Sequence, residues 1–155
     1  MKDIFSKNAL AYINKDKNKN CGKMDFLSQI KQTYVFEPYL NIGNDNHRKA
    51  ITKLRLSSHK LEIEVGRWKR LTREERICRC CELGKVENET HFLFECPKYT
   101  QKRVTMYNFI KEKLGIDMQK EHEQIKNLKF LFNTGELSTT NALGKYIYEC
   151  FQERQ

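Results

Sequence analysis

The feature that most constrains the fold of this chain is a string of three cysteines and one histidine within 19 residues. Its spacing is Cys78-x2-Cys81-x9-His91-x4-Cys96. Two cysteines separated by two residues can present both sulfurs to one tetrahedral ion, and a histidine and a cysteine about one turn apart can complete the set. Three thiolates and an imidazole favour zinc over magnesium or calcium, which prefer oxygen. The spacing predicts one zinc ion, with the segment 77–99 folded around it as a zinc knuckle.

Cys80 leaves one ambiguity in the ligand set, because it is adjacent to Cys81 and can pair with Cys78 in its place. The two-residue gap is the commoner arrangement, which favours Cys81. Four protein ligands fill a tetrahedron and leave no position for a reacting water, so we expect a structural ion. The alternative is a set of unmetallated thiols with a histidine packed nearby. The two remaining cysteines, Cys21 and Cys150, are isolated and are expected to be ordinary thiols.

Basic side chains gather immediately before the cysteine pair. The chain carries a net charge of +9, and from Arg48 to Arg79 eleven Lys and Arg stand against four Glu. Such a stretch attracts polyanions, and arginine suits phosphate because it can donate two parallel hydrogen bonds. We therefore expect RNA or DNA to bind residues 48–79, although a merely soluble basic face is the alternative. The side chains expected to bind are Arg48, Lys49, Lys53, Arg55, Arg67, Trp68, Lys69, Arg70, Arg73 and Arg76.

The only tryptophan of the chain stands among cations, in the sequence Arg67-Trp68-Lys69-Arg70. An aromatic ring in this setting can stack on an unpaired base while its neighbours hold phosphates. The competing interpretation, which we favour for the ring itself, is that Trp68 fills the core beneath the knuckle and the cations form a solvated rim. In either case phosphate contacts would position a nucleic acid without reading its sequence.

Nothing in the sequence nominates an enzyme active site. The chain has no Gly-rich phosphate loop, no His-Glu-x-x-His motif and no pair of adjacent aspartates, and its thiols lack a recognisable base. The other histidines, His47, His59 and His122, are expected to be exposed. No apolar run approaches the roughly 20 residues that cross a bilayer. We expect a non-enzymatic protein without a membrane partner, located in the nucleus or cytoplasm, where thiols stay reduced.

The apolar pattern predicts a mainly α-helical fold, a small helical domain with the knuckle as an irregular insert and at most a short β-hairpin. Residues 1–22 are expected to form a short helix, Ile4–Ile13, followed by a polar linker. Residues 23–115 are expected to form a basic helical region that contains the knuckle. Residues 116–155 are expected to form C-terminal helices that pack on the same domain.

Individual elements follow from periodicity and from capping residues. Helices are predicted over 23–34, over 47–57 with Asn44 or Asn46 as the cap, from Pro97 to a stop at Gly115, over 121–132 and over 138–154. A helical turn is predicted over His91–Glu95. Leucine, isoleucine and valine alternate with glutamates over 61–65, which favours a short strand or an extended loop.

Six segments share their residue types with one known family, and from 47 to 97 their order and spacing agree as well. They are Phe36–Leu40, His47–His59, Glu64–Trp68, Arg73–Cys81, Glu89–Pro97 and Lys145–Tyr148. Together they resemble the C-terminal region of reverse transcriptases encoded by LINE-like, non-LTR retrotransposons of animals. The similarity covers roughly residue 30 to the C-terminus.

In that family a Cys-Cys-His-Cys knuckle follows the polymerase and helps to grip template RNA or target DNA. The resemblance implies that Cys78, Cys81, His91 and Cys96 bind zinc. The fingers, palm and thumb are missing, together with the polymerase aspartates and any endonuclease domain. The resemblance therefore implies the tail of such a protein, without polymerase or endonuclease activity of its own.

Two further functions remain open at this point. The chain can be a zinc-stapled protein-interaction or structural domain, in which the charge is incidental, or a non-functional remnant of a retroelement. The sequence does not indicate an oligomeric state, and it does not separate RNA from DNA as the partner.

Overall fold

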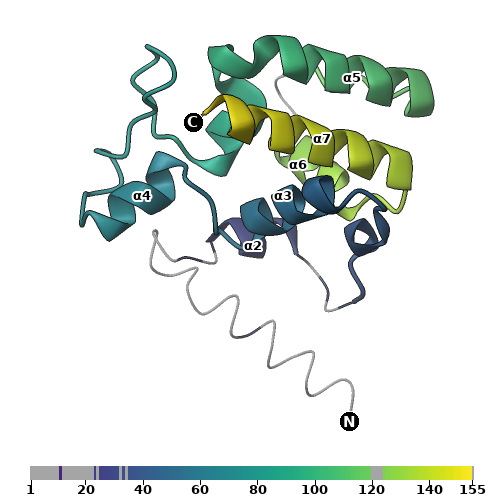
Figure 1. The fold of residues 1–155 in the computed structure, drawn as a ribbon, viewed down its shortest axis with the longest axis horizontal. Helices are drawn as coiled ribbons and strands as arrows, with labels where there is room; N and C mark the ends of the chain where they lie inside the picture. Colours follow the sequence, from purple (N-terminus) through teal and green to yellow (C-terminus); the bar gives the residue numbers. More distant parts are fainter. Residues whose placement is uncertain are drawn as a thin grey trace.

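The computed structural model describes residues 11, 23, 25–31, 33, 35–119 and 124–154, called the described residues below. Almost all regular structure among them is helical (Figure 1), which confirms the predicted mainly α-helical fold. The predicted N-terminal helix and linker lie outside the described residues except at Ala11. The elements are α2 (Asp25–Ile30), η2 (Pro38–Asn41), α3 (Asp45–Arg55), α4 (Glu62–Trp68), η3 (His91–Glu95), η4 (Pro97–Tyr99), α5 (Thr100–Leu114), α6 (Gln124–Asn133) and α7 (Leu137–Glu153).

Helix α7 is the centre of the helical body, and it packs between α3 and α5 (Figure 1). Helices α6 and α2 contact each other, and α6 also contacts α7. The core contains Leu54 of α3, Ile110 of α5, and Leu143 and Ile147 of α7, none of which is exposed. The C-terminal helices therefore pack on the same body as the basic region.

The crossing of α3 and α7 depends on Gly144. A Cβ atom at this position would lie 2.7 Å from Cβ of His47 and 3.0 Å from the His47 carbonyl oxygen. Such distances are below ordinary van der Waals contact, so only glycine lets the two helices approach this closely. His47 is held at the crossing by a hydrogen bond of 2.8 Å between its Nδ1 and Oδ1 of Asn141.

Capping residues explain where most helices begin and end. Asn44 caps α3 as predicted, because its Oδ1 accepts hydrogen bonds from the backbone N–H groups of Asn46 and His47. Helix α5 ends at Gly115, whose φ of 68° lies in the left-handed region that glycine adopts without strain. Helix α7 begins at Leu137, one residue before the predicted start at 138, and Glu136 caps it. Helix α2 is shorter than the predicted helix over 23–34.

The expectation of a strand or extended loop over 61–65 is wrong, because residues 62–68 form helix α4. Over five residues an alternating pattern does not separate a strand from a short helix. Glu62 and Glu64 lie in the first turn, where the helix dipole favours negative charge. The Glu62 backbone N–H also donates to the buried carboxylate of Glu87, at 2.7 Å, which satisfies one N–H group at the helix start.

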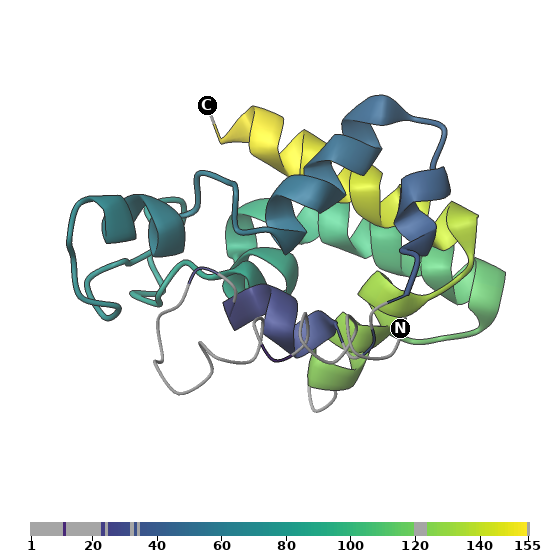
Figure 2. The same ribbon diagram turned by 90° about the horizontal axis from the view of Figure 1, so that it is seen from below.

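Helix α4 and the loop that carries the cysteine pair extend from one end of the helical body, as both ribbon views show (Figures 1 and 2). The loop is closed by one antiparallel bridge, between Ile77 and Val86. Among the described residues, this bridge is all that forms of the short hairpin that the sequence allowed. Across all the described residues, no helix is long and apolar enough to cross a membrane.

Candidate functional site

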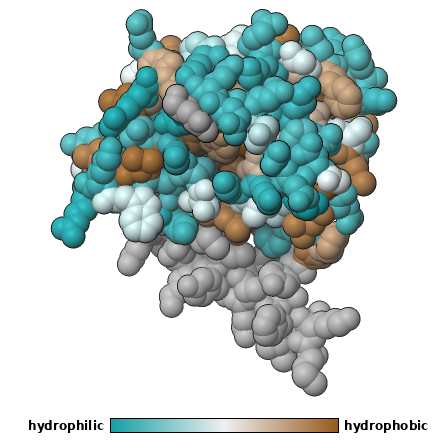
Figure 3. All heavy atoms as spheres, in the orientation of Figure 1, coloured by the Kyte–Doolittle hydropathy of each residue, from teal (hydrophilic) through white to brown (hydrophobic). Residues whose placement is uncertain are grey.

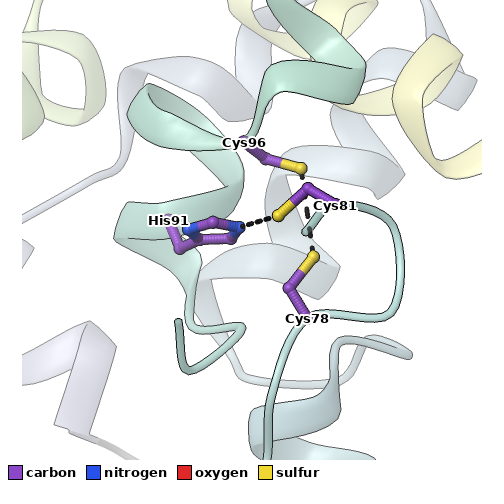
Figure 4. Close-up of side chains that lie close together, drawn as sticks. All are labelled: Cys78, Cys81, His91 and Cys96. Carbon is purple, nitrogen blue, oxygen red and sulfur yellow. Dashed lines mark hydrogen bonds between the residues drawn. The ribbon is translucent and has the colours of Figure 1, made fainter. Parts of the chain in front are cut away.

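The structure brings Cys78, Cys81, His91 and Cys96 together at one point between the loop and the helical body (Figure 4). One possible ligand atom from each residue lies within 4.8 Å of those of the other three. The Sγ atoms of Cys78 and Cys96 are 3.9 Å apart, and Sγ of Cys81 is 3.5 Å from Nε2 of His91. Three sulfurs and one imidazole nitrogen that converge in this way can hold a metal ion.

The first two cysteines are positioned by the bridged loop. The backbone N–H of Cys78 donates to the Lys85 carbonyl at 2.9 Å, and Gly84 supplies the left-handed turn, with φ of 63°. The backbone N–H of Cys80 points to Sγ of Cys78 at 3.4 Å. Such an N–H···S contact stabilises a thiolate and turns the chain so that Cys81 faces back toward Cys78.

The other two residues lie at the start and just past the end of a single short turn, η3. Asn88 Oδ1 accepts the backbone N–H of His91 at 2.8 Å at the start of this turn. At its end the Cys96 N–H donates to the His91 carbonyl at 2.8 Å, five residues back, which makes the turn wider than an α-helical one. This extra width lets two side chains five residues apart point to the same place.

Helices α5 and α7 hold the η3 turn from behind. Arg103 is buried and donates to the carbonyl oxygens of Leu93 and Cys96, each at 2.8 Å, and to that of Phe92 at 3.4 Å. The Tyr146 hydroxyl donates to the Phe92 carbonyl at 3.0 Å. These donors satisfy carbonyl groups that the short turn leaves unpaired. The site is thereby fixed to the core and does not depend on the loop alone.

Arg154 resolves the ambiguity over Cys80. Cys80 also lies near Cys78 and the carboxylate of Glu87, which together form a second candidate ligand set. Arg154 contacts both oxygens of Glu87 and lies 3.0 Å from Sγ of Cys80. The guanidinium occupies the space in which a second metal ion would lie, and its positive charge already balances the negative charge of the Glu87 carboxylate. Cys80 is therefore turned away from the four-residue cluster, and Cys81 completes it.

The protonation of the cysteines bears on what the cluster can bind. Burial raises the pKa of Cys78 and the pKa of Cys96, so without a cation both are neutral thiols. A metal must displace these protons when it binds. The second ring nitrogen of His91, Nδ1, lies 3.4 Å from the Glu95 carboxylate, which also accepts from Lys85. A carboxylate in this position orients a metal-binding imidazole.

Two of the predicted nucleic-acid-binding residues are not surface residues. Arg55 is 2% exposed and is held by Glu37 and the Phe132 carbonyl, beneath the ring of Tyr39. Arg76 is also buried, and it donates to the carbonyl oxygens of Ile63 and Leu71. Both guanidiniums stabilise the fold by satisfying buried acceptors, so their assignment to a phosphate-binding surface was wrong.

The remaining predicted cations divide into two groups. Arg48, Arg67 and Arg73 are partly buried and lie near acidic partners, Asp45, Glu64 and Asp25 respectively. Lys49, Lys53, Lys69 and Arg70 are exposed, as is Lys60 between them in sequence. The side chains of these five make no ion pair within the described part of the chain. They are therefore available to an external anion.

Trp68 does not fill the core. It is 79% exposed at the end of α4, with the guanidinium of Arg67 5.7 Å from the centre of its ring. The favoured interpretation, a core residue beneath the knuckle, was wrong because α4 turns the face that carries this residue outward. Arg70, two residues later, adopts φ of 60°, a turn conformation that ends the helix. The exposed ring and the exposed Lys69 and Arg70 lie together at this tip.

The expectation of exposed histidines was also wrong where the structure describes them. The side chain of His59 is 1% exposed, and its Nε2 is 3.0 Å from Oε1 of the buried Glu89. His47 is half-buried at the α3–α7 crossing. His122 lies outside the described residues. The His59 imidazole contacts the carboxylate of the buried Glu89, and the His47 imidazole contacts the amide of the partly buried Asn141.

The sequence interpretation missed Arg103, Glu87 and Arg154. One signal could have found Arg103: it lies on the apolar stripe of α5, one turn from Tyr99 and Met106. A single arginine within an apolar stripe indicates a buried cation that binds carbonyl oxygens or a carboxylate. Glu87 and Arg154 are 67 residues apart and carried no such signal.

Comparisons with known proteins do not identify the chain: no family model, no curated protein and no solved structure matches it.

Proposed function

We propose that this chain is a zinc-stabilised nucleic-acid-binding module, similar to the C-terminal tail of a LINE-like reverse transcriptase and without polymerase or endonuclease activity of its own. One observation carries the proposal: the only tryptophan is 79% exposed, beside exposed cations, in a chain of net charge +9. Exposing a large aromatic ring to water is unfavourable, and an exposed ring beside cations is the arrangement with which proteins stack on unpaired bases.

The distances within the cluster support zinc as the ion. In a regular tetrahedron with Zn–S bonds of about 2.3 Å, two sulfurs lie about 3.8 Å apart, and a sulfur and a nitrogen about 3.5 Å. The corresponding distances here are 3.9 Å between Cys78 and Cys96 and 3.5 Å between Cys81 and His91. Four protein ligands complete the coordination shell, so the ion would staple the loop to the core and would not act on a substrate.

The surface favours single-stranded nucleic acid as the partner. An exposed ring can stack on a base only where that base is not already stacked and paired. Lys69 and Arg70 follow the ring directly and can hold the phosphates beside it. If all five unpaired cations each contact one phosphate, the logarithm of the affinity falls with the logarithm of the salt concentration with a slope of about −3.5.

Fluorescence anisotropy with labelled short single strands and duplexes tests the proposal. We expect Trp68→Ala to weaken single-strand binding by about 5- to 150-fold, the range for loss of one stacked base. The thermal midpoint of unfolding should stay unchanged, because the ring is exposed. Leu83→Ala is the matched control, since Leu83 is 50% exposed elsewhere on the knuckle loop. Absence of single-strand binding by the wild-type protein at low salt would refute the proposal.

Native mass spectrometry with and without a chelator tests the metal separately. We expect one zinc ion per chain, lost in Cys96→Ser and retained in Cys80→Ser, because Cys80 points to Arg154. Zinc bound to both variants would overturn the ligand assignment. The metal count and the binding of oligonucleotides are measured independently. The prediction of zinc binding and the prediction of nucleic-acid binding can therefore be refuted separately.

An apolar surface gives some support to the alternative, a zinc-stapled protein-interaction domain. Val35 and Phe36 are adjacent, and each is 65% exposed. Contiguous exposed apolar residues mark contact surfaces in soluble proteins. Reversing the charges of Lys69 and Arg70 distinguishes the two functions: it should abolish nucleic-acid binding under our proposal, and it should have no effect on a partner that binds at Val35 and Phe36.

A further inference from the structure

An open pocket of about 500 Å³ lies where the C-terminal ends of α3 and α7 meet α4. It is distinct from the metal cluster and from the exposed tryptophan. Its walls are Lys53, Ser58, His59, Lys60, Val65, Phe151, Gln152 and Arg154. The volume falls within the range of small-ligand sites, about 300–1,000 Å³. None of these residues is acidic, so the described lining favours a negatively charged occupant.

Two of the lining cations are available to a ligand. Lys53 lies in the last turn of α3, and Lys60 follows the turn after this helix. Both are exposed, with no ion pair or side-chain hydrogen bond in the described part of the chain. Arg154 is different, because Glu87 neutralises its charge and its Nε donates to the Lys60 carbonyl at 3.1 Å. Arg154 therefore fixes the loop that carries Lys60 and leaves the binding of an anion to the two lysines.

The floor of the pocket is apolar and rigid. Val65 and Phe151 supply it, and the Phe151 ring is stacked on Phe92 with ring centres 5.0 Å apart. The imidazole of His59 lies beside the Phe151 ring and is fixed by the Glu89 carboxylate. A bare phosphate would gain nothing from this floor, whereas a ligand with both a phosphate and a flat ring can use the lysines and the apolar surface together.

The pocket is also close to Trp68. Val65 and Trp68 are three residues apart on α4, a spacing that places Cβ atoms about 5–6 Å from each other on one side of a helix. The face seen in Figure 3 is mostly hydrophilic, with scattered apolar side chains. A single strand could therefore place one base on Trp68 and a neighbouring nucleotide in the pocket.

From these observations we infer that the pocket between α3, α4 and α7 binds one nucleotide, with its phosphate at Lys53 and Lys60 and its ring against Val65 and Phe151. The inference rests on the proposed function in one respect: in the assembled complex, the nucleotide belongs to the single strand that stacks on Trp68. The chemistry is the same for a free nucleotide and for one within a strand, so the experiment must separate the two sources.

The test uses the metal-loaded full chain and the double variant Lys53→Glu/Lys60→Glu. Both lysines are exposed, so the variant should fold, which circular dichroism checks. We expect single-strand affinity to fall at least about tenfold, and the salt slope to become shallower by about 1.4, the loss of two phosphate contacts. Lys113→Glu is the control: it reverses an exposed charge at the far end of α5 and should change affinity less than about twofold.

A second arm separates a nucleotide pocket from a basic patch. Adenosine monophosphate should compete with the labelled strand at concentrations at which inorganic phosphate does not, and the double variant should lose this competition. Equal competition by phosphate would overturn the inference, as would a double variant that binds the strand like Lys113→Glu. In that last case the proposed function survives.

Calorimetry with adenosine monophosphate covers the remaining outcomes. If the nucleotide binds wild-type protein and no oligonucleotide does, the pocket stands as a site for a free nucleotide and only the proposed function fails. If neither binds at low salt, both fail.

Discussion

Replacing Arg103 by methionine should destabilise the protein far more than the same change at the adjacent lysine. Arg103 is 6% exposed, and its guanidinium donates to three carbonyl oxygens of the turn that carries His91 and Cys96. Methionine keeps most of the apolar contact of the side chain but leaves those three acceptors without a donor. A hydrogen bond to a charged group contributes about 1.5–3 kcal/mol, and the two short ones dominate.

From these values we expect a loss of about 3–5 kcal/mol in the free energy of unfolding. For a chain of this size such a loss lowers the thermal midpoint by about 6–20 °C. Urea unfolding at fixed zinc concentration, followed by far-ultraviolet circular dichroism, measures the difference. Zinc affinity should fall as well, because the turn that supplies two of the four candidate ligands is no longer held.

Lys102→Met is the matched control for this measurement. Lys102 precedes Arg103 on the same helix and pairs with Glu153 at the surface. Exposed ion pairs contribute about 0–1 kcal/mol, so this variant should unfold close to the wild-type midpoint. Equal midpoints for Lys102→Met and Arg103→Met would refute the argument that α5 holds the metal-binding turn through Arg103.

Two further predictions concern α7. Gly144→Ala should lower the free energy of unfolding in urea by about 1–3 kcal/mol, because the new Cβ would lie 2.7 Å from Cβ of His47. Gly135→Ala is the control and should cause no such loss, because Gly135 has open space around it. Equal losses for the two variants would contradict the close crossing of α3 and α7. Hydrogen bonds from Thr139 and Ser138 lower the pKa of Glu136 from 4.5 to about 2. A lowered pKa adds stability that is present above the unfolded value and is lost as the pH falls toward the folded one. Glu136→Gln should therefore be less stable than the wild-type protein at neutral pH, and the difference in stability should disappear as the pH falls from about 4.5 to about 2. A difference that does not change with pH would contradict this prediction.

Comparison of sequence and structure shows which kinds of inference are safe for a chain like this. The start of α3 and the end of α5 followed from local signals, the Asn44 cap and the Gly115 stop, because a helix end depends on side chains within one turn of it. The short helix α4 was missed because seven residues contain less than two full helical periods. Its acidic first turn was the stronger signal, and the alternating pattern obscured it.

Exposure was the property that the sequence predicted least well. Trp68 was expected to be buried and is exposed, while Arg55, Arg76 and His59 were expected at the surface and are buried. Burial depends on which faces of the elements meet, and long basic side chains can supply both apolar contact and hydrogen bonds to a core. Composition alone therefore could not distinguish cations that stabilise the fold from those available to a ligand.

The sequence by itself determined the mainly helical fold and a possible metal site formed by Cys78, His91, Cys96 and one of two adjacent cysteines. Both rest on short-range geometry, since helical periodicity and the spacing of cysteines and histidine act over a few turns of chain. Only the tertiary structure decided that Cys81, and not Cys80, faces the cluster, that Arg154 contacts Cys80, and that Arg103 holds the turn that carries His91 and Cys96. Those assignments depend on contacts between segments far apart in the chain, and these form only when the helices pack.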